Sequence, residues 1–196
     1  LCGICYANCY DVNGLNMKKK FSLKPTFEVN TGDFWGIKNL SKPKALLAMA
    51  ALAALGNVLG FVMIPIGPQA KLDLTTLPLL IVACLYGPLP AFISGILGSL
   101  VTILQFGHPF SPFFWYGPYL FVCALLAKKV RVALVPWLAL IVMWPTLGYW
   151  LNVVFLGFGM AIWGVIGVKE FVMTLVYGVM VERLLASPRI RKVFLS

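Results

Sequence analysis

The chain has 196 residues, of which 61% are hydrophobic and 11% are charged. Its mean hydropathy of +0.92 lies far above that of an ordinary soluble domain, which excludes a soluble fold and indicates an integral membrane protein. The formal charge of +10 does not indicate nucleic-acid binding, because the basic residues are spread over loops and tails and no basic helix carries interleaved aromatic residues.

Residues 1–43 are polar and irregular, and they predict a cytoplasmic extension outside the membrane. Cys2, Cys5 and Cys9 form a C-x2-C-x3-C pattern, whose first pair has the spacing that offers two thiolates to zinc or iron. A closed site needs a fourth ligand, which would be Asp11, a cysteine outside this sequence or a residue of another chain. Reduced free thiols are the simpler interpretation. We expect no cleavable signal peptide, because the first apolar run starts late and no small-residue cleavage site follows it.

Residues 44–64 predict the first membrane-spanning helix. They contain no charge after Lys44, and at 1.5 Å per residue they reach roughly the 30 Å of a bilayer core. Small or polar side chains share one face of this helix: Ala50, Ala53, Ala54, Asn57 and Gly60, with Gly56 at the edge. Small residues four apart let a second helix approach closely, and that helix belongs either to this chain or to a partner subunit.

Residues 65–73 predict a loop with three polar side chains, Gln69, Lys71 and Asp73, which is placed to close over a ligand. Proline, glycine and polar residues divide the rest of the apolar sequence into further spans. The second to sixth spans are predicted at 74–86, 91–106, 113–127, 132–156 and 161–185, and a basic tail at 187–196.

Lys and Arg are distributed unequally between the two sides of these spans. Seven lie in the N-terminal tail up to Lys44, three in the turn at 128–131 and four beyond Glu182, whereas the loop at 65–73 has one. By the positive-inside rule the basic regions are cytoplasmic. We therefore predict an all-α membrane protein, a bundle of six transmembrane helices over 44–186 with both termini in the cytoplasm.

The segment KLDLTTLPLLIVACLYGPLPAFISGILGSL, residues 71–100, resembles a known family. Together with the Ala-rich first helix and six spans in fewer than 200 residues, it is similar to the substrate-binding S components of energy-coupling-factor (ECF) vitamin transporters. The riboflavin-type branch is the most similar. The likeness covers about 42–185, and the cysteine-bearing extension departs from the family pattern.

The resemblance implies a prokaryotic plasma-membrane subunit that captures a vitamin from outside and is not itself an enzyme. It also implies a transmembrane T component and two cytoplasmic ATPases as partners, with Ala50 and Ala54 of the first helix facing the T component and the 65–73 loop gating the ligand. The chain contains no G-x-x-x-x-G-K-[ST] run, which agrees with ATP hydrolysis by a partner.

Polar side chains at membrane depth are costly, and they mark functional or paired positions. Those on the predicted outer side, with nearby aromatic residues, form a candidate slot for a flat heterocycle. The candidates are Gln69, Lys71, Asp73, His108, Trp115, Tyr116, Tyr149, Trp150, Asn152, Lys169 and Glu170.

Some of these candidates also have a purely structural interpretation. Lys71 and Asp73 suit a surface pair or a helix cap, His108 suits a turn, and Trp115 and Tyr116 suit membrane-interface anchors.

Asn152, Lys169 and Glu170 lie in otherwise apolar spans, where a functional role is favoured. Adjacent residues of a helix point about 100° apart, so we expect Lys169 and Glu170 to have different partners.

Other functional classes fit the sequence less well. A membrane enzyme would need a reacting set of side chains, but the chain has one His and no H-E-x-x-H. A redox or metal-sensing protein would depend on the N-terminal cysteines alone. A self-contained secondary carrier or channel is the main alternative, although neither an inverted repeat nor an intramembrane charge relay is evident.

Overall fold

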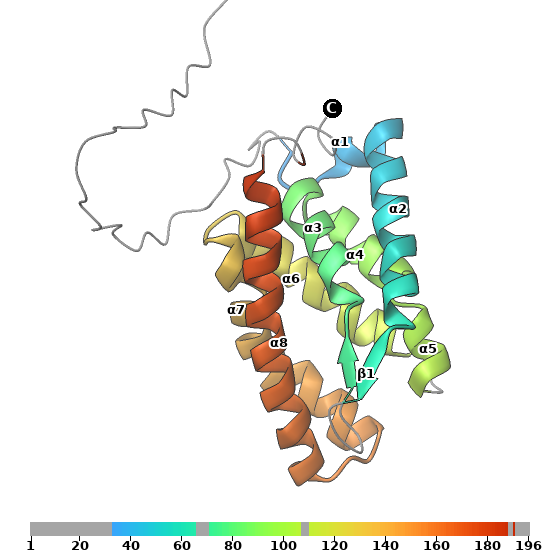
Figure 1. The fold of residues 1–196 in the computed structure, drawn as a ribbon, viewed down its shortest axis with the longest axis vertical. Coiled ribbons are helices and arrows are strands. Elements are labelled where there is room, and N and C mark those ends of the chain that lie inside the picture. Colours follow the sequence, from blue (N-terminus) through green and yellow to red (C-terminus); the bar gives the residue numbers. More distant parts are fainter. Residues whose placement is uncertain (1–32, 66–70, 107–109, 188–189, 191–196) are drawn as a thin grey trace, which may run out of the picture.

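The computed structural model describes residues 33–65, 71–106, 110–187 and 190, and these form a helical bundle with one short β-hairpin (Figure 1). In chain order the elements are α1 (Ile37–Leu40), α2 (Pro43–Gly60), β1 (Met63–Pro65), β2 (Lys71–Asp73), α3 (Thr76–Tyr86), α4 (Pro88–Gly98), α5 (Val101–Phe106), η1 (Pro112–Tyr116), α6 (Gly117–Ala127), η2 (Val132–Leu134), α7 (Val135–Met143), η3 (Trp144–Gly148), η4 (Trp150–Phe155) and α8 (Met160–Ala186). The elements η1, η3 and η4 are π-helical, and η2 is a 3-10 helix.

Within the described residues, four helical stretches are long and apolar enough to cross a membrane by length and composition. They are Pro43–Gly60, Pro88–Gln105, Val132–Phe155 and Met160–Ala186. Two shorter apolar stretches are Thr76–Tyr86 and Pro112–Ala127. Each of these stretches overlaps a predicted span, so the fold is that of an apolar helical protein compatible with several membrane crossings.

The predicted loop after the first helix is partly a β-hairpin, so the described chain is not entirely helical. Met63 lies opposite Asp73 and Pro65 opposite Lys71 in an antiparallel pair. The first helix consequently ends at Gly60 and does not reach 64 as predicted. Proline has no N–H for a helix interior but fits the end of a strand, and Pro65 stands in such a place.

The helix α3 occupies the centre of the bundle. All its residues over 78–84 are buried, and it packs against α2, α4, α6 and α8. A helix that is apolar on every side belongs inside a protein, which explains why this short helix has no polar face. The core extends from α3 to Leu120, Leu140 and Val181, which are at most 1% exposed.

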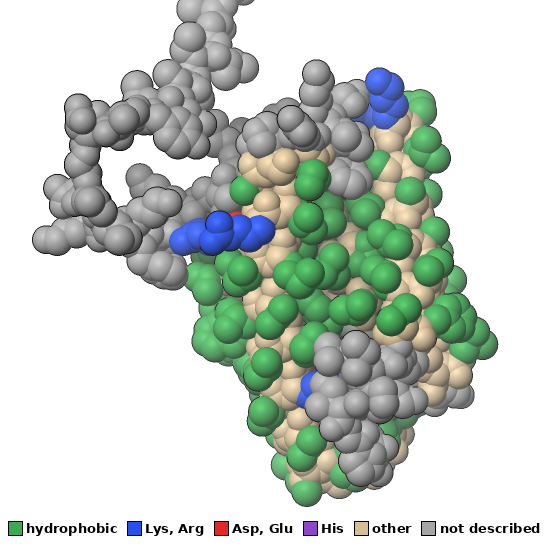
Figure 2. All heavy atoms as spheres, viewed as in Figure 1, with side chains coloured by type: hydrophobic (Ala, Val, Ile, Leu, Met, Phe, Trp, Pro, Cys, Tyr) green, Lys and Arg blue, Asp and Glu red, His purple; other side chains and the backbone are tan. Residues whose placement is uncertain are grey.

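The outer surface of the bundle is apolar. On α8 the side chains of Val165, Val168 and Val172 are 62%, 67% and 58% exposed. Figure 2 shows hydrophobic side chains over most of one side of the molecule, with the basic side chains mostly toward the end that carries α1. A soluble monomer rarely exposes so large an apolar surface, whereas lipid tails would cover it without cost.

The stretch Pro88–Gln105 is broken between α4 and α5, and a side chain from α2 fills the break. The Asn57 Nδ2 donates a hydrogen bond to the carbonyl of Leu97 at 2.7 Å, and its Oδ1 accepts one from the N–H of Val101 at 2.8 Å. Backbone groups freed inside a membrane must find protein partners. Asn57 therefore supports the fold of this broken helix.

Part of the predicted N-terminal extension packs onto the bundle. The N–H of Leu89 donates to the Trp35 carbonyl at 3.1 Å, and the Asn39 Nδ2 donates to the Tyr86 carbonyl at 2.9 Å. The Trp35 ring also stacks on Phe121, with centroids 6.1 Å apart. These contacts satisfy backbone groups at the turn between α3 and α4, so the packed unit starts before the first predicted span.

Candidate functional site

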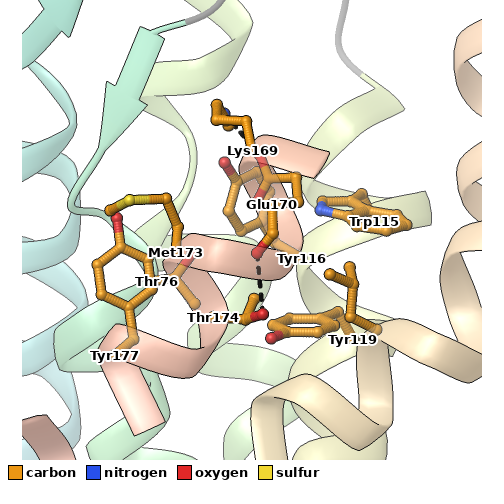
Figure 3. A pocket seen from close by; sticks show the side chains of 10 residues that line it. Thr76, Trp115, Tyr116, Tyr119, Lys169, Glu170, Met173, Thr174 and Tyr177 are labelled. Carbon is orange, nitrogen blue, oxygen red and sulfur yellow. Dashed lines mark hydrogen bonds and ion pairs between the residues drawn. The ribbon is translucent and has the colours of Figure 1, made fainter. Parts of the chain in front are cut away.

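A pocket lies where four apolar stretches meet inside the bundle (Figure 3). Thr76 comes from α3, Leu140 from α7, and the remaining lining residues come from η1, α6 and α8. The complete lining is Thr76, Trp115, Tyr116, Tyr119, Leu140, Lys169, Glu170, Met173, Thr174 and Tyr177.

Aromatic rings form one wall of the pocket. Trp115 and Tyr119 stand one helical turn apart, and their rings are nearly parallel, with centroids 5.9 Å apart and planes at 7°. Trp115 also makes a T-shaped contact with Trp144, with centroids 5.7 Å apart and planes at 82°. Trp163 in turn stacks on Trp144 at 5.6 Å and 13°. The wall is therefore a continuous, close-packed aromatic cluster.

Two glycines make room for this cluster. A Cβ on Gly167 would lie 2.6 Å from Trp144 Nε1, and a Cβ on Gly148 would lie 3.2 Å from Trp115 Cζ3. Both positions are occupied by the one residue type that lets an indole ring lie directly against the helix backbone. The positions of Trp144 and Trp115 therefore depend on these two small residues.

Lys169 and Glu170 form an ion pair that faces the pocket. The Lys169 Nζ lies 2.6 Å from Glu170 Oε1, and the side chains are 17% and 27% exposed. The expectation that these neighbours have different partners is therefore wrong, because their long side chains bend toward each other despite leaving the helix in different directions. A close pair lowers the cost of holding both charges away from water.

Two pocket hydroxyls are used by the protein itself. The Tyr119 hydroxyl donates to the Pro136 carbonyl at 3.1 Å, and the Thr174 hydroxyl donates to the Glu170 backbone carbonyl at 2.8 Å. Figure 3 shows Trp115 and Tyr119 on one side of the pocket, with Met173 and Tyr177 across from them. Tyr119 and Thr174 therefore shape the walls.

The pocket is small. Its volume is about 20 Å³, which is enough for about one water molecule. A ligand with aromatic rings can enter only if lining side chains move aside. Met173 and Lys169 have long unbranched side chains and are the lining residues best suited to do so.

The structure thus brings four of the predicted site residues, Trp115, Tyr116, Lys169 and Glu170, to one pocket. Three others lie away from its lining. The Asn152 Nδ2 donates to the Gly148 carbonyl of its own helix at 2.7 Å. Tyr149 packs its ring edge-on against Trp163 at 5.8 Å, and Trp150 stacks on Phe155 at 5.7 Å.

Other predicted positions lie wholly or partly outside the described residues. Gln69, His108 and the candidate metal ligands Cys2, Cys5 and Cys9 are among those not described. The backbones of Lys71 and Asp73 lie in β2. The helix α3, which contributes Thr76 to the pocket, begins three residues after this strand. No group of three or more His, Cys, Asp or Glu side chains suited to a metal ion occurs in the described part of the chain.

The predicted docking residues Ala50 and Ala54 are both exposed on α2. Ala53 and Gly56, which the sequence places on the same small face, are instead buried inside the bundle. The small face is therefore divided between internal packing and an outward surface.

Six lining residues were not predicted: Thr76, Tyr119, Leu140, Met173, Thr174 and Tyr177. Helical spacing from the predicted residues could have found four of them. Tyr119 follows Trp115 by four positions, and Met173, Thr174 and Tyr177 follow Glu170 by three, four and seven. No local signal marks Thr76 or Leu140, which reach the pocket from other spans.

No protein-family model, curated protein or solved structure matches this chain.

Proposed function

We propose that this chain is the substrate-capture subunit of an ECF-type transporter in the plasma membrane of a prokaryote. It binds a vitamin or related micronutrient from outside for ATP-driven uptake, and a flavin-like compound is the first ligand to test. A transmembrane T component and two cytoplasmic ATPases complete the transporter. The chain itself catalyses no reaction.

The observation that carries this proposal is the pocket in which Trp115 and Tyr119 face an ion pair within an apolar bundle. Ligand sites are typically apolar and aromatic, with a few polar groups that fix orientation. Ionisable residues inside a membrane bundle mark functional positions by default. This combination suits a flat heterocycle with polar edges better than it suits an inert core.

The proposal includes six spans with both termini in the cytoplasm. It is supported by the way the basic regions meet at one end of the bundle. Lys128 contacts the carbonyl and the ring of Phe34, and Arg131 pairs with Glu182 near the end of α8. The N-terminal segment, the turn at 128–131 and the C-terminal end of α8 therefore share one side, and positive charge favours the cytoplasm there.

The test is ligand binding by the purified chain in mild detergent, followed by tryptophan fluorescence. Riboflavin should quench the emission, and Lys169→Ala should weaken binding at least tenfold, which corresponds to about 1.4 kcal/mol. Asn152→Ala is the matched control, since its side chain bonds only within its own helix in the contacts described. If the Lys169 variant and the parent bound riboflavin with equal affinity, the assignment of this pocket as the ligand site would be wrong.

A self-contained secondary carrier or channel is the alternative, and the intramembrane Lys169–Glu170 pair is the observation that favours it. Pairs of this kind serve ion coupling in carriers. Uptake into proteoliposomes that contain only this chain separates the two proposals. A capture subunit gives no uptake until the T component and ATPases are added with ATP, whereas a carrier needs neither.

A further inference from the structure

The two long apolar parts of the sequence, 45–127 and 132–181, each contain as many acidic as basic residues. Between Lys44 and Lys128 the acidic and basic residues are one Lys and one Asp, and between Arg131 and Glu182 they are Lys169 and Glu170. Each region therefore has no net charge, although the whole chain carries +10. The basic excess is confined to the ends and to the turn at 128–131.

The same balance holds inside the pocket. Lys169 and Glu170 are the charged members of its lining, and they lie against each other at 2.6 Å. The other lining side chains are aromatic, aliphatic, hydroxyl-bearing or, for Met173, a thioether. Any ligand that enters therefore meets a positive and a negative group side by side, with no excess of either sign among the lining residues that the structure describes.

We infer that this pocket selects a ligand without net charge, whose flat ring lies against the aromatic wall and whose edge carries a hydrogen-bond donor beside an acceptor. An amide-like edge donates to the Glu170 carboxylate and accepts from the Lys169 ammonium. This inference rests on the proposed role of the pocket as a ligand site, and it narrows the class of ligand.

The physical reason is the cost of excess charge in a medium of low dielectric. A neutral edge can satisfy both members of the pair while their charges continue to cancel. An anion or a cation brings one more charge that the lining does not balance, and it loses its hydration on entry. The Lys169–Glu170 pair thus disfavours the binding of ions of either sign relative to a neutral ligand.

This reasoning predicts how single substitutions change the preference. Glu170→Gln leaves the pocket with one positive charge, so anions should become the preferred ligands. Lys169→Met leaves one negative charge, so cations should become preferred. A variant with both Lys169→Gln and Glu170→Gln has no net charge and should still prefer the uncharged ligand.

The experiment uses three planar probes of nearly equal size, 4-fluorobenzamide, 4-fluorobenzoate and 4-fluorobenzamidine. At neutral pH their charges are zero, negative and positive, and one ring demands less opening of the pocket than a vitamin does. Binding to the full chain in detergent is measured by fluorine NMR. The variant Met173→Trp fills the pocket with a larger side chain. The signal that a probe still gives with this variant measures its partition into micelles and is subtracted. Glu182→Gln is the control for loss of a carboxylate elsewhere on α8.

We expect the parent chain and Glu182→Gln to bind the benzamide at least tenfold more tightly than either ion. We expect the order to change to benzoate first in Glu170→Gln and to benzamidine first in Lys169→Met. The double variant keeps the test decisive if a single variant does not fold.

Three binding results for the parent and the single variants would overturn the inference: an ion bound as tightly as the benzamide by the parent, no change of order in the folded single variants, or no binding of any probe. A double variant that prefers an ion would also overturn it. Lack of ATP-driven uptake with this order intact would refute the transporter proposal alone. Uptake of a charged ligand through the pocket would refute this inference alone.

Discussion

Two asparagines in apolar helices show how one residue type acquires different roles. Both donate to the carbonyl four residues earlier, Asn57 to Ala53 at 3.2 Å and Asn152 to Gly148 at 2.7 Å. Asn57 also bonds across to the break between α4 and α5, whereas the hydrogen bond of Asn152 to Gly148 stays within its own helix. A polar residue in a span indicates a role, but its neighbours decide which role.

Glycine substitution on α8 should separate packing of the aromatic cluster from helix propensity. Gly167→Ala places a Cβ 2.6 Å from Trp144 Nε1, so Trp144 and with it Trp115 must shift, at a cost of about 1–3 kcal/mol. We expect a lower midpoint of thermal unfolding in detergent, together with altered tryptophan emission.

The matched control for this prediction is Gly164→Ala, three residues earlier on the same helix. A Cβ there meets nothing within 4 Å, so the variant should be as stable as the parent or gain up to about 1 kcal/mol from helix propensity. Equal thermal stability of the Gly167 and Gly164 variants would contradict the proposed packing of Trp144 on α8.

At the scale of elements, α2 presents small residues in two directions. Inside the bundle, a Cβ on Gly56 would lie 2.7 Å from the Gly98 carbonyl, and Gly98 in turn faces the backbone of Ala53. This close approach of α2 and α4 places Asn57 beside the break between α4 and α5. On the outside, Ala50 and Ala54 are exposed beside the 72% exposed Leu47. The inner face fixes the fold, and the outer face remains available for lipid or a partner.

Two adjacent alanines test this division. Ala53→Leu should destabilise the isolated chain by about 1–3 kcal/mol, because bulk is forced between α2 and α4. Ala54→Leu should leave folding and ligand binding unchanged, while copurification with a T component and ATP-dependent uptake are lost. Retention of assembly and uptake by a folded Ala54→Leu variant would remove the docking face from the proposal.

At the scale of the whole molecule, the fold joins basic regions that are far apart in the sequence. Glu182 accepts hydrogen bonds from Arg131 and from the N–H of Ala133 at 2.8 Å, which fixes the turn before α7 to the end of α8. Lys128 joins the same turn to Phe34. These contacts hold the basic regions together at one end of the bundle. The segments η1, η3 and η4, in contrast, are rich in aromatic residues that contact one another. Such an asymmetric distribution of charge sets the orientation of a protein in a membrane.

Labelling of intact cells tests this orientation. In a chain without its five native cysteines, a cysteine at His108 should react with a membrane-impermeant maleimide, and one at Lys129 should react only after the cells are opened. The expectation follows from the positive-inside rule. The reverse pattern would place the basic end outside and would contradict both the topology and the proposed direction of capture.

The sequence by itself determined the helical, apolar character of the chain and the approximate helix boundaries. These depend on local properties, namely the length of uncharged runs and the positions of proline and glycine. It also marked Trp115, Tyr116, Lys169 and Glu170, because polar and aromatic residues are conspicuous in apolar spans. The β-hairpin escaped notice, since three-residue strands carry too few side chains for a period of two to be seen.

Only the tertiary structure decided which of these residues meet. The pairing of Lys169 with Glu170 depends on side-chain rotamers in a shared pocket, and the helical wheel alone suggested the opposite. Thr76 and Leu140 reach that pocket from other helices, and the packing of the Trp35 segment on the α3–α4 turn joins positions about fifty residues apart. Such contacts depend on how helices pack together, and helical periodicity records only which face of a helix is apolar.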